Sequence, residues 1–274
     1  MTSLAQSART TAGKARNSRI LEMSARAGFV GYGVLHLAVA WLAVQIAFGH
    51  ATEEGSQSGA FRLLSHQPLG RPLLVVVVVG LLAMAVWQLL EAAVGNRAET
   101  GGRRTAERVL SAARAVVYAA LAWTALRVLT GTPTSSAGQQ EHATAGVLAH
   151  PAGRVLVFIA ALVVVGVGIG LFAYGVGRMF ERKLTTGRMS YGIRKLVVGL
   201  GQVGYIAKGI AFGIVGLLVA GAAVQRNAAK SNGLDGALHT LAGKPYGQVL
   251  LVAIAAGFAA FGLYCFFQSR YRKV

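Results

Sequence analysis

Acidic residues are scarce in this chain: nine Asp and Glu stand against 27 Lys and Arg among its 274 residues. Charged residues of both signs make up only 13% of the sequence, about half the share usual in soluble proteins. The patterns GxSxG, HExxH and DxD, which place nucleophiles, metal ligands or paired carboxylates, are all absent. We therefore expect no enzymatic activity and assign no catalytic residue.

Cysteine is represented by Cys265 alone, which excludes an intramolecular disulfide. Histidine is also rare, and His36 stands by itself inside an apolar run, whereas a b-type haem needs two axial ligands at similar depth. The other five histidines show no i, i+3 or i, i+4 ligand spacing; they are His50, His66, His142, His150 and His239. No metal site and no cofactor are predicted.

What the chain does have is long apolar runs. Hydrophobic residues make up 54% of it, and blocks of about 20 apolar residues match the roughly 30 Å hydrocarbon core of a bilayer. The sequence therefore predicts an all-α membrane protein with six transmembrane helices. The expected spans cover residues 28–48, 72–94, 109–130, 153–176, 196–224 and 247–268.

The basic residues are distributed unevenly between these spans. Eighteen Lys and Arg lie in the N-terminal tail, the connections after the second and fourth spans, and the C-terminus, whereas six lie in the other connections. The positive-inside rule then predicts that both termini are cytoplasmic. Because topology accounts for the net charge of +18, we expect no nucleic-acid binding. The tail carries no short apolar region with a cleavage site, so the first span is expected to act as an uncleaved insertion signal.

A Pro-x-Gly triplet opens the second, fourth and sixth spans. The copies begin at Pro68, Pro151 and Pro245, and their glycines are Gly70, Gly153 and Gly247. Apolar residues at helical spacing precede each copy, which predicts a short interfacial helix on the outer face that proline ends. The glycine would then supply a backbone conformation closed to other residues. The alternative is that these prolines and glycines belong to ordinary loops, where both residues are common. Their recurrence at matched positions in three copies favours a repeated unit.

Each unit would run from the cytoplasm outward, along an outer connection, and back. An even number of spans separates the units, so they are parallel repeats, and a quasi-threefold ring of outer helices is expected. The predicted segments are a basic tail (1–25), repeat one (26–97), repeat two (98–178), repeat three (179–268) and the C-terminus (269–274).

Residues 25–43, 59–74 and 234–251 together resemble the domain-of-unknown-function family numbered 1206. The resemblance implies a bacterial plasma-membrane protein built from three two-helix repeats, with no established activity to transfer. Repeat two departs from the pattern: residues 111–115 are similar to residues 24–27, but valine and leucine replace the glycines of the first span.

Three polar residues inside the spans form the candidate site: Lys208, Glu91 and His36. Charges within a membrane are costly and often functional, and Lys208 and Glu91 could pair between the fifth and second spans. A structural ion pair, or snorkelling of Lys208 to headgroups, is an equal alternative. For His36 we favour a hydrogen bond between helices.

Glycines in the fourth and fifth spans indicate close helix packing. Gly166 and Gly170 are four residues apart, as are Gly209 and Gly213, a spacing that lets helix backbones approach in lipid. Residues 199–204 match GxGxxG, but they open an apolar span instead of following a strand, so no dinucleotide site is expected.

Three roles remain open at this stage. The first is a non-catalytic scaffold or accessory subunit that contacts anionic lipids through its basic loops and binds a membrane protein partner or a second copy. The second is a small-solute or ion transporter that uses Lys208, Glu91 and His36. The third is a lipid-binding or lipid-carrying protein.

Overall fold

The computed structural model describes residues 19–94, 101–132 and 134–272, and the regular elements in these ranges are helices. Six of them are long and apolar enough to cross a membrane, which confirms the predicted spans. They are α2 (Arg19–Ala47), α4 (Gly70–Val94), α5 (Gly101–Leu129), α7 (Gly153–Val176), α8 (Tyr191–Gln225) and α10 (Gly247–Tyr271).

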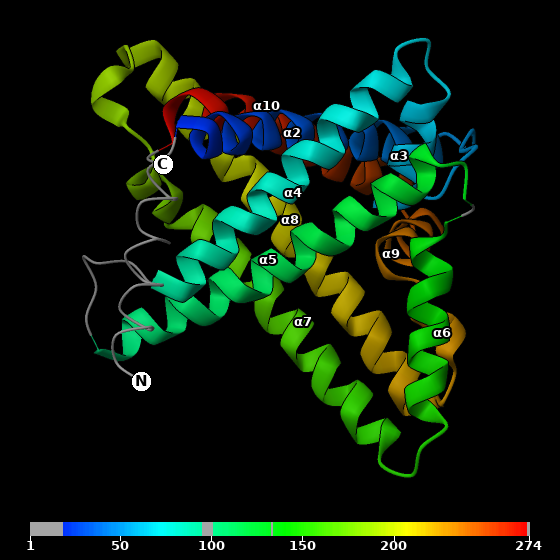
Figure 1. The fold of residues 1–274 in the computed structure, drawn as a ribbon. Helices are drawn as coiled ribbons and strands as arrows, with labels where there is room; N and C mark the ends of the chain where they lie inside the picture. The colour runs from blue at the N-terminus through cyan, green and yellow to red at the C-terminus, as the bar shows by residue number, and fades with distance from the viewer. Residues whose placement is uncertain (1–18, 95–100, 133, 273–274) are drawn as a thin grey trace.

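Three short helices precede the Pro-x-Gly triplets, as predicted: α3 (Gln57–Ser65), α6 (Ser136–Leu148) and α9 (Gly233–Ala242). All three lie at one end of the molecule, on the right in Figure 1. The ends of α4, α7 and α10 lie at the opposite end, with the short 3₁₀ turns η1 (Met179–Lys183) and η2 (Thr186–Arg188). A further 3₁₀ turn, η3 (Ala228–Lys230), leads into α9.

The Pro-x-Gly turn has the same geometry in all three copies. The glycine N–H donates to the carbonyl of the residue before proline at 2.8–2.9 Å, and the next span begins at the glycine. None of the three glycines has a positive φ, so the predicted conformational reason for glycine is wrong. The reason is close approach. A Cβ on Gly70, Gly153 or Gly247 would lie within 2.2 Å of a carbonyl oxygen near the end of the short helix.

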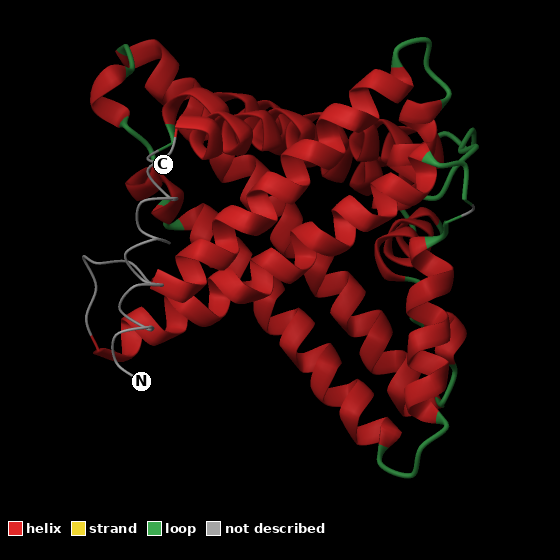
Figure 2. Cartoon of the chain, in the orientation of Figure 1, coloured by secondary structure: helices red, strands yellow, loops and turns green. Residues whose placement is uncertain are grey.

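The spans pack in pairs that join neighbouring repeats. Helix α2 packs on α10, α4 on α5, and α7 on α8, so each pair takes one helix from each of two repeats. Figures 1 and 2 show the α4–α5 and α7–α8 pairs crossing near the middle of the molecule, with the α2–α10 pair along the top of the view. This packing between helices of different repeats joins the three hairpins into one body around a quasi-threefold axis.

The symmetry fails in the second repeat. Helices α2 and α4 pack on each other, as do α8 and α10, but α5 and α7 share no packed interface among the described residues. In the first repeat two glycines allow the approach: a Cβ on Gly80 would lie 2.7 Å from the Cα of Gly28. Gly257 has the same role against Ala207 in the third repeat. A shift of 83 positions from Gly80 leads to Val163, whose branched side chain prevents such an approach and is 60% exposed.

The apolar core lies mainly where the first and third repeats meet. Its largest buried side chains include Leu35, Leu42, Phe61, Leu74 and Leu251, from α2, α3, α4 and α10. A second cluster around Phe180 and Tyr264 lies at the end opposite the short helices. By contrast, 17% of the residues in the most apolar 18-residue stretch of α7 are buried, compared with 61% in the corresponding stretch of α2.

Candidate intramembrane polar site

Lys208 of α8 is buried at the meeting point of the repeats. Its Nζ lies 3.1 Å from the Tyr32 Oη and 3.2 Å from the His36 Nε2, both on α2. It also lies 4.0 Å from the centre of the Phe261 ring of α10. Tyr32 and His36 are four residues apart, so they share one face of their helix.

The hydrogen bonds fix the proton on His36. Its Nδ1 lies 2.8 Å from the backbone carbonyl of Tyr32, and a carbonyl oxygen only accepts, so Nδ1 carries the hydrogen. The Nε2 lone pair therefore accepts from Lys208, and the imidazole is neutral. An ammonium has three N–H groups; here two meet Tyr32 and His36, and the Phe261 ring face takes the third direction. The Lys208 ammonium is thus fully coordinated without a carboxylate.

Aromatic rings surround this cluster. The Tyr32 ring contacts the edge of His36 at 4.3 Å between centroids and Tyr118 of α5 at 5.7 Å. Phe258 of α10 lies 6.4 Å from His36. The cluster therefore receives side chains from all three repeats, and its rings exclude water from the ammonium.

Tyr32, the partner that sequence reasoning missed, has a recognisable signal. The register that matches Gly28 with Gly204 carries Tyr32 onto Lys208 at a shift of 176 positions. Equivalent positions of a quasi-threefold arrangement lie near each other when they face the axis. The third equivalent, 83 positions after Tyr32, is Ala115, which is also buried.

Glu91 does not join this cluster. Its Oε2 accepts a hydrogen bond of 3.4 Å from the Ser111 hydroxyl, which links α4 to α5. The partners of Lys208 among the described residues are Tyr32, His36 and Phe261, so the predicted Lys208–Glu91 pair is not formed. The physical reason is lateral placement, because α4 packs on α2 and α5 instead of on α8.

The predicted glycine pairs have different environments. Gly209 and Gly213 lie in the α7–α8 interface, where a Cβ on Gly168 would come within 2.8 Å of both. A Cβ on Gly166 or Gly170 would meet nothing within 4 Å, so this pair is open. The GxGxxG match at residues 199–204 lies inside α8, as expected for a packing motif.

Polar contacts join the three short helices and the segments before them into a ring. The Ser58 hydroxyl accepts from the Ser136 amide at 2.9 Å, which links the first and second repeats. Thr144 and Ser231 share a hydroxyl hydrogen bond of 2.8 Å between the second and third. The Gly55 amide donates to the Asp235 Oδ1 at 2.7 Å and closes the ring. The quasi-threefold ring predicted from the triplets is therefore present.

Glu54 is the most densely bonded carboxylate of this ring. The Ser56 and Ser58 hydroxyls donate to it at 3.0 Å each, and Arg62 Nη2 lies 3.7 Å from its Oε1. Burial alone raises the pKa of Glu54. The hydrogen bonds from Ser135, Ser56 and Ser58 and the Arg62 charge outweigh burial and hold the pKa below 4.5. Glu54 is therefore ionised at neutral pH.

Arg62 extends this network in two directions. Its Nε lies 2.5 Å from the Glu53 Oε2, and its Nη1 donates to the Thr134 carbonyl before α6. The five histidines other than His36 do not combine with other ligands: the described residues contain no group of three or more His, Cys, Asp or Glu that could hold a metal.

The sequence profile of the family described as Domain of Unknown Function (DUF1206) matches residues 27–95, 110–178 and 203–272. The three matched segments confirm the family resemblance and the three-repeat architecture. YxxB, an uncharacterised protein of Bacillus subtilis strain 168, is 29% identical over 250 residues, which cover 91% of this chain and 90% of that protein. No solved structure matches.

Proposed function

The chain belongs to the DUF1206 family, and we propose that it is a non-catalytic membrane scaffold that receives a transmembrane helix of another protein between α5 and α7. One observation carries this proposal: repeats one and three close their hairpins, whereas α5 and α7 remain apart. Each of these two helices packs along a narrow stripe on one neighbouring span, so most of its apolar surface has no partner within the chain.

The residues of this surface fit another helix. Val163 and Leu162 of α7 are 60% and 55% exposed, and Val116 and Trp123 of α5 are 69% and 62% exposed. Lipid tails would cover such side chains equally well, so exposure alone does not indicate a protein. The second feature is the arrangement of glycines on α7.

Gly166 and Gly170 lie two residues on either side of Gly168, which faces α8. At 3.6 residues per turn, both therefore lie roughly on the opposite face of α7. Small residues four apart let two helix backbones approach in lipid, and the chain leaves this pair unused while it uses Gly168, Gly209 and Gly213 internally. The open pair supports a protein helix as the occupant.

The proposal places the protein in the bacterial plasma membrane with the basic end in the cytoplasm, where anionic lipids would also contact it. The grouping of α3, α6 and α9 at the end opposite the basic connections supports this orientation. Of the basic residues counted in the sequence, Arg9, Lys14, Arg16, Arg97 and Lys273 lie outside the described residues.

The contacts of Lys208 support a structural role more than transport. A transport site binds and releases its solute, and an ammonium needs a free direction to take part in that exchange. All three directions of Lys208 are filled by protein groups. Glu91, the acid that transport would have paired with Lys208, bonds to Ser111 instead.

A photo-crosslinking amino acid at Val163, compared with one at Val249 of α10, tests the scaffold proposal in native membranes. Both positions are at least 60% exposed, but Val249 is outside the α5–α7 surface. We expect one discrete protein adduct at Val163, absent at Val249, whose partner mass spectrometry identifies.

A double Gly166→Leu, Gly170→Leu variant should abolish that adduct, whereas Gly221→Leu, at another open glycine, should leave it intact. Equal labelling at Val163 and Val249, no protein adduct, or an adduct with a second copy of this chain would each contradict the proposal.

A further inference from the structure

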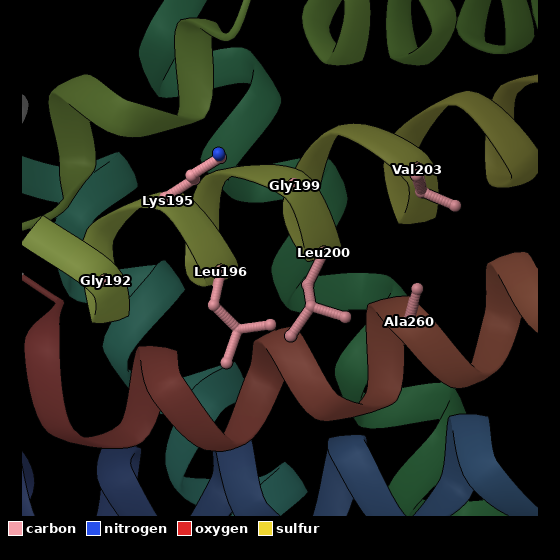
Figure 3. Close-up of a pocket in the computed structure, with 7 residues that line it drawn as sticks. All are labelled: Gly192, Lys195, Leu196, Gly199, Leu200, Val203 and Ala260. Carbon is pink, nitrogen blue, oxygen red and sulfur yellow. The ribbon is translucent and has the colours of Figure 1, made fainter.

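A groove of about 480 Å³ runs along α8 beside α10. Figure 3 shows Leu196, Leu200 and Val203 of α8 along it, with Ala260 of α10 on the other side. Lys195 and Gly192 lie at one end. The lining residues are apolar or glycine apart from Lys195.

Two glycines, which have no side chain, leave the space that forms this groove. Gly192 and Gly199 are seven residues apart, so they lie on the same face of α8, and a Cβ on either would meet nothing within 4 Å. Elsewhere on α8, Gly201 and Gly204 lie against Phe180 and Phe261, where a Cβ would come within 2.7 Å. These close contacts hold α8 against its neighbours while the other glycines leave space beside them.

The charge of Lys195 is available to a ligand. The neighbouring Arg194 lies 3.4 Å from Glu181, whereas the described structure gives Lys195 no carboxylate partner. The connection from residue 178 to residue 195 carries six Lys and Arg against this single Glu. Tyr191, four residues before Lys195, is 84% exposed, as is typical of aromatic residues at a membrane interface.

Along α8 the basic residue Lys195 is followed by apolar surface, in the same order as the phosphate and the acyl chain of a phospholipid. From Lys195 to Val203 the helix rises about 12 Å, in the direction that leads from the basic end of α8 toward the middle of the span. We propose that the groove binds one acyl chain of an anionic phospholipid whose phosphate contacts Lys195.

Native mass spectrometry tests this site on the full chain, exchanged into nanodiscs with equal amounts of phosphatidylglycerol and phosphatidylcholine that carry the same acyl chains. We expect the wild-type chain to retain phosphatidylglycerol in preference after release from the nanodisc. Lys195→Gln should reduce that preference about fivefold, the factor for one cation beside an anionic lipid, whereas Lys195→Arg should keep it.

Gly199→Leu should fill the groove and abolish retention of both lipids. Gly221→Leu, at another glycine of α8 with open space around it, is the matched control and should retain lipid as the wild type does. Circular dichroism confirms that each variant is folded. Undiminished retention in Gly199→Leu, an unchanged preference in Lys195→Gln, or a dimer that Gly199→Leu dissolves would overturn the proposal.

Discussion

The side chains of Tyr32 and Lys208 occupy equivalent positions of the first and third repeats, and they hydrogen-bond to each other, Oη to Nζ, at 3.1 Å. Identical residues at equivalent positions near an axis would place like groups together, which two lysines could not tolerate. Divergence of the repeats provides a donor at one position, an acceptor at the second and a methyl group, that of Ala115, at the third. The polar centre of the fold therefore depends on how the repeats differ.

Tyr32→Phe should lower the free energy of unfolding more than the double variant Tyr32→Phe, Lys208→Met does. The single change removes an acceptor from a buried ammonium, which costs about 1.5–3 kcal/mol for a hydrogen bond to a charged group. The double change also removes the charge, and a buried charge replaced by an apolar side chain of similar length is often neutral. Equilibrium unfolding in detergent micelles measures both.

Tyr205→Phe is the control for this comparison. The Tyr205 ring packs on Phe180 and Phe261, but its hydroxyl makes no hydrogen bond within the described structure, so the variant should unfold like the wild type. A double variant that is less stable than Tyr32→Phe would show that Lys208 stabilises the fold without Tyr32.

Gly247→Ala should destabilise the third Pro-x-Gly turn, whereas Gly243→Ala in the same turn should not. A Cβ at Gly247 would lie 2.2 Å from the Leu241 carbonyl oxygen, but at Gly243 the nearest atoms are 3.9 Å away. Forcing backbone apart at a packed site costs about 1–3 kcal/mol. Thermal unfolding of the two variants separates a steric requirement from a general preference for glycine, and equal melting temperatures would contradict the close-approach explanation.

Gly80→Ala tests why the first hairpin is closed. Its Cβ would lie 2.7 Å from the Gly28 Cα, so α2 and α4 would have to separate, and we expect a loss of about 1–3 kcal/mol. Gly166→Ala on α7 is the control, because no atom lies within 4 Å of its Cβ, and it should be neutral or slightly stabilising. Spin labels on α2 and α4 would show a wider distance in Gly80→Ala only.

Much of this architecture follows from local signals in the sequence. The length of the apolar runs predicts the six spans, and the Pro-x-Gly triplets predict the three short helices. Both signals depend only on residues that are close in the sequence. The role of Gly70 needed the structure: the sequence gives its position but not the carbonyl oxygen that lies against it. The same holds for Val163, whose effect depends on which helix it would face.

Lateral placement explains the error at the candidate site. Residue counting places Lys208 and Glu91 inside the fifth and second spans, but it does not say which spans are neighbours. The spans pair between repeats, so α4 lies on α5, and Glu91 meets Ser111 there. One neighbour of Lys208 does follow from the sequence, because aligning the first and third repeats places Tyr32 at the position equivalent to Lys208.

Acid should weaken the ring of short helices through Glu54. Its pKa in the folded protein is below 4.5, because hydrogen bonds from Ser135, Ser56 and Ser58 and the Arg62 charge outweigh burial. A carboxyl group with a depressed folded pKa stabilises the fold above its unfolded pKa, and this contribution disappears as pH falls through the folded value. The free energy of unfolding should therefore decline below about pH 4.5, and Glu54→Gln should remove part of that decline while it lowers stability at pH 7. Glu141→Gln, at a carboxyl outside this network, is the control, and an equal acid response in Glu54→Gln and Glu141→Gln would assign the decline to other groups.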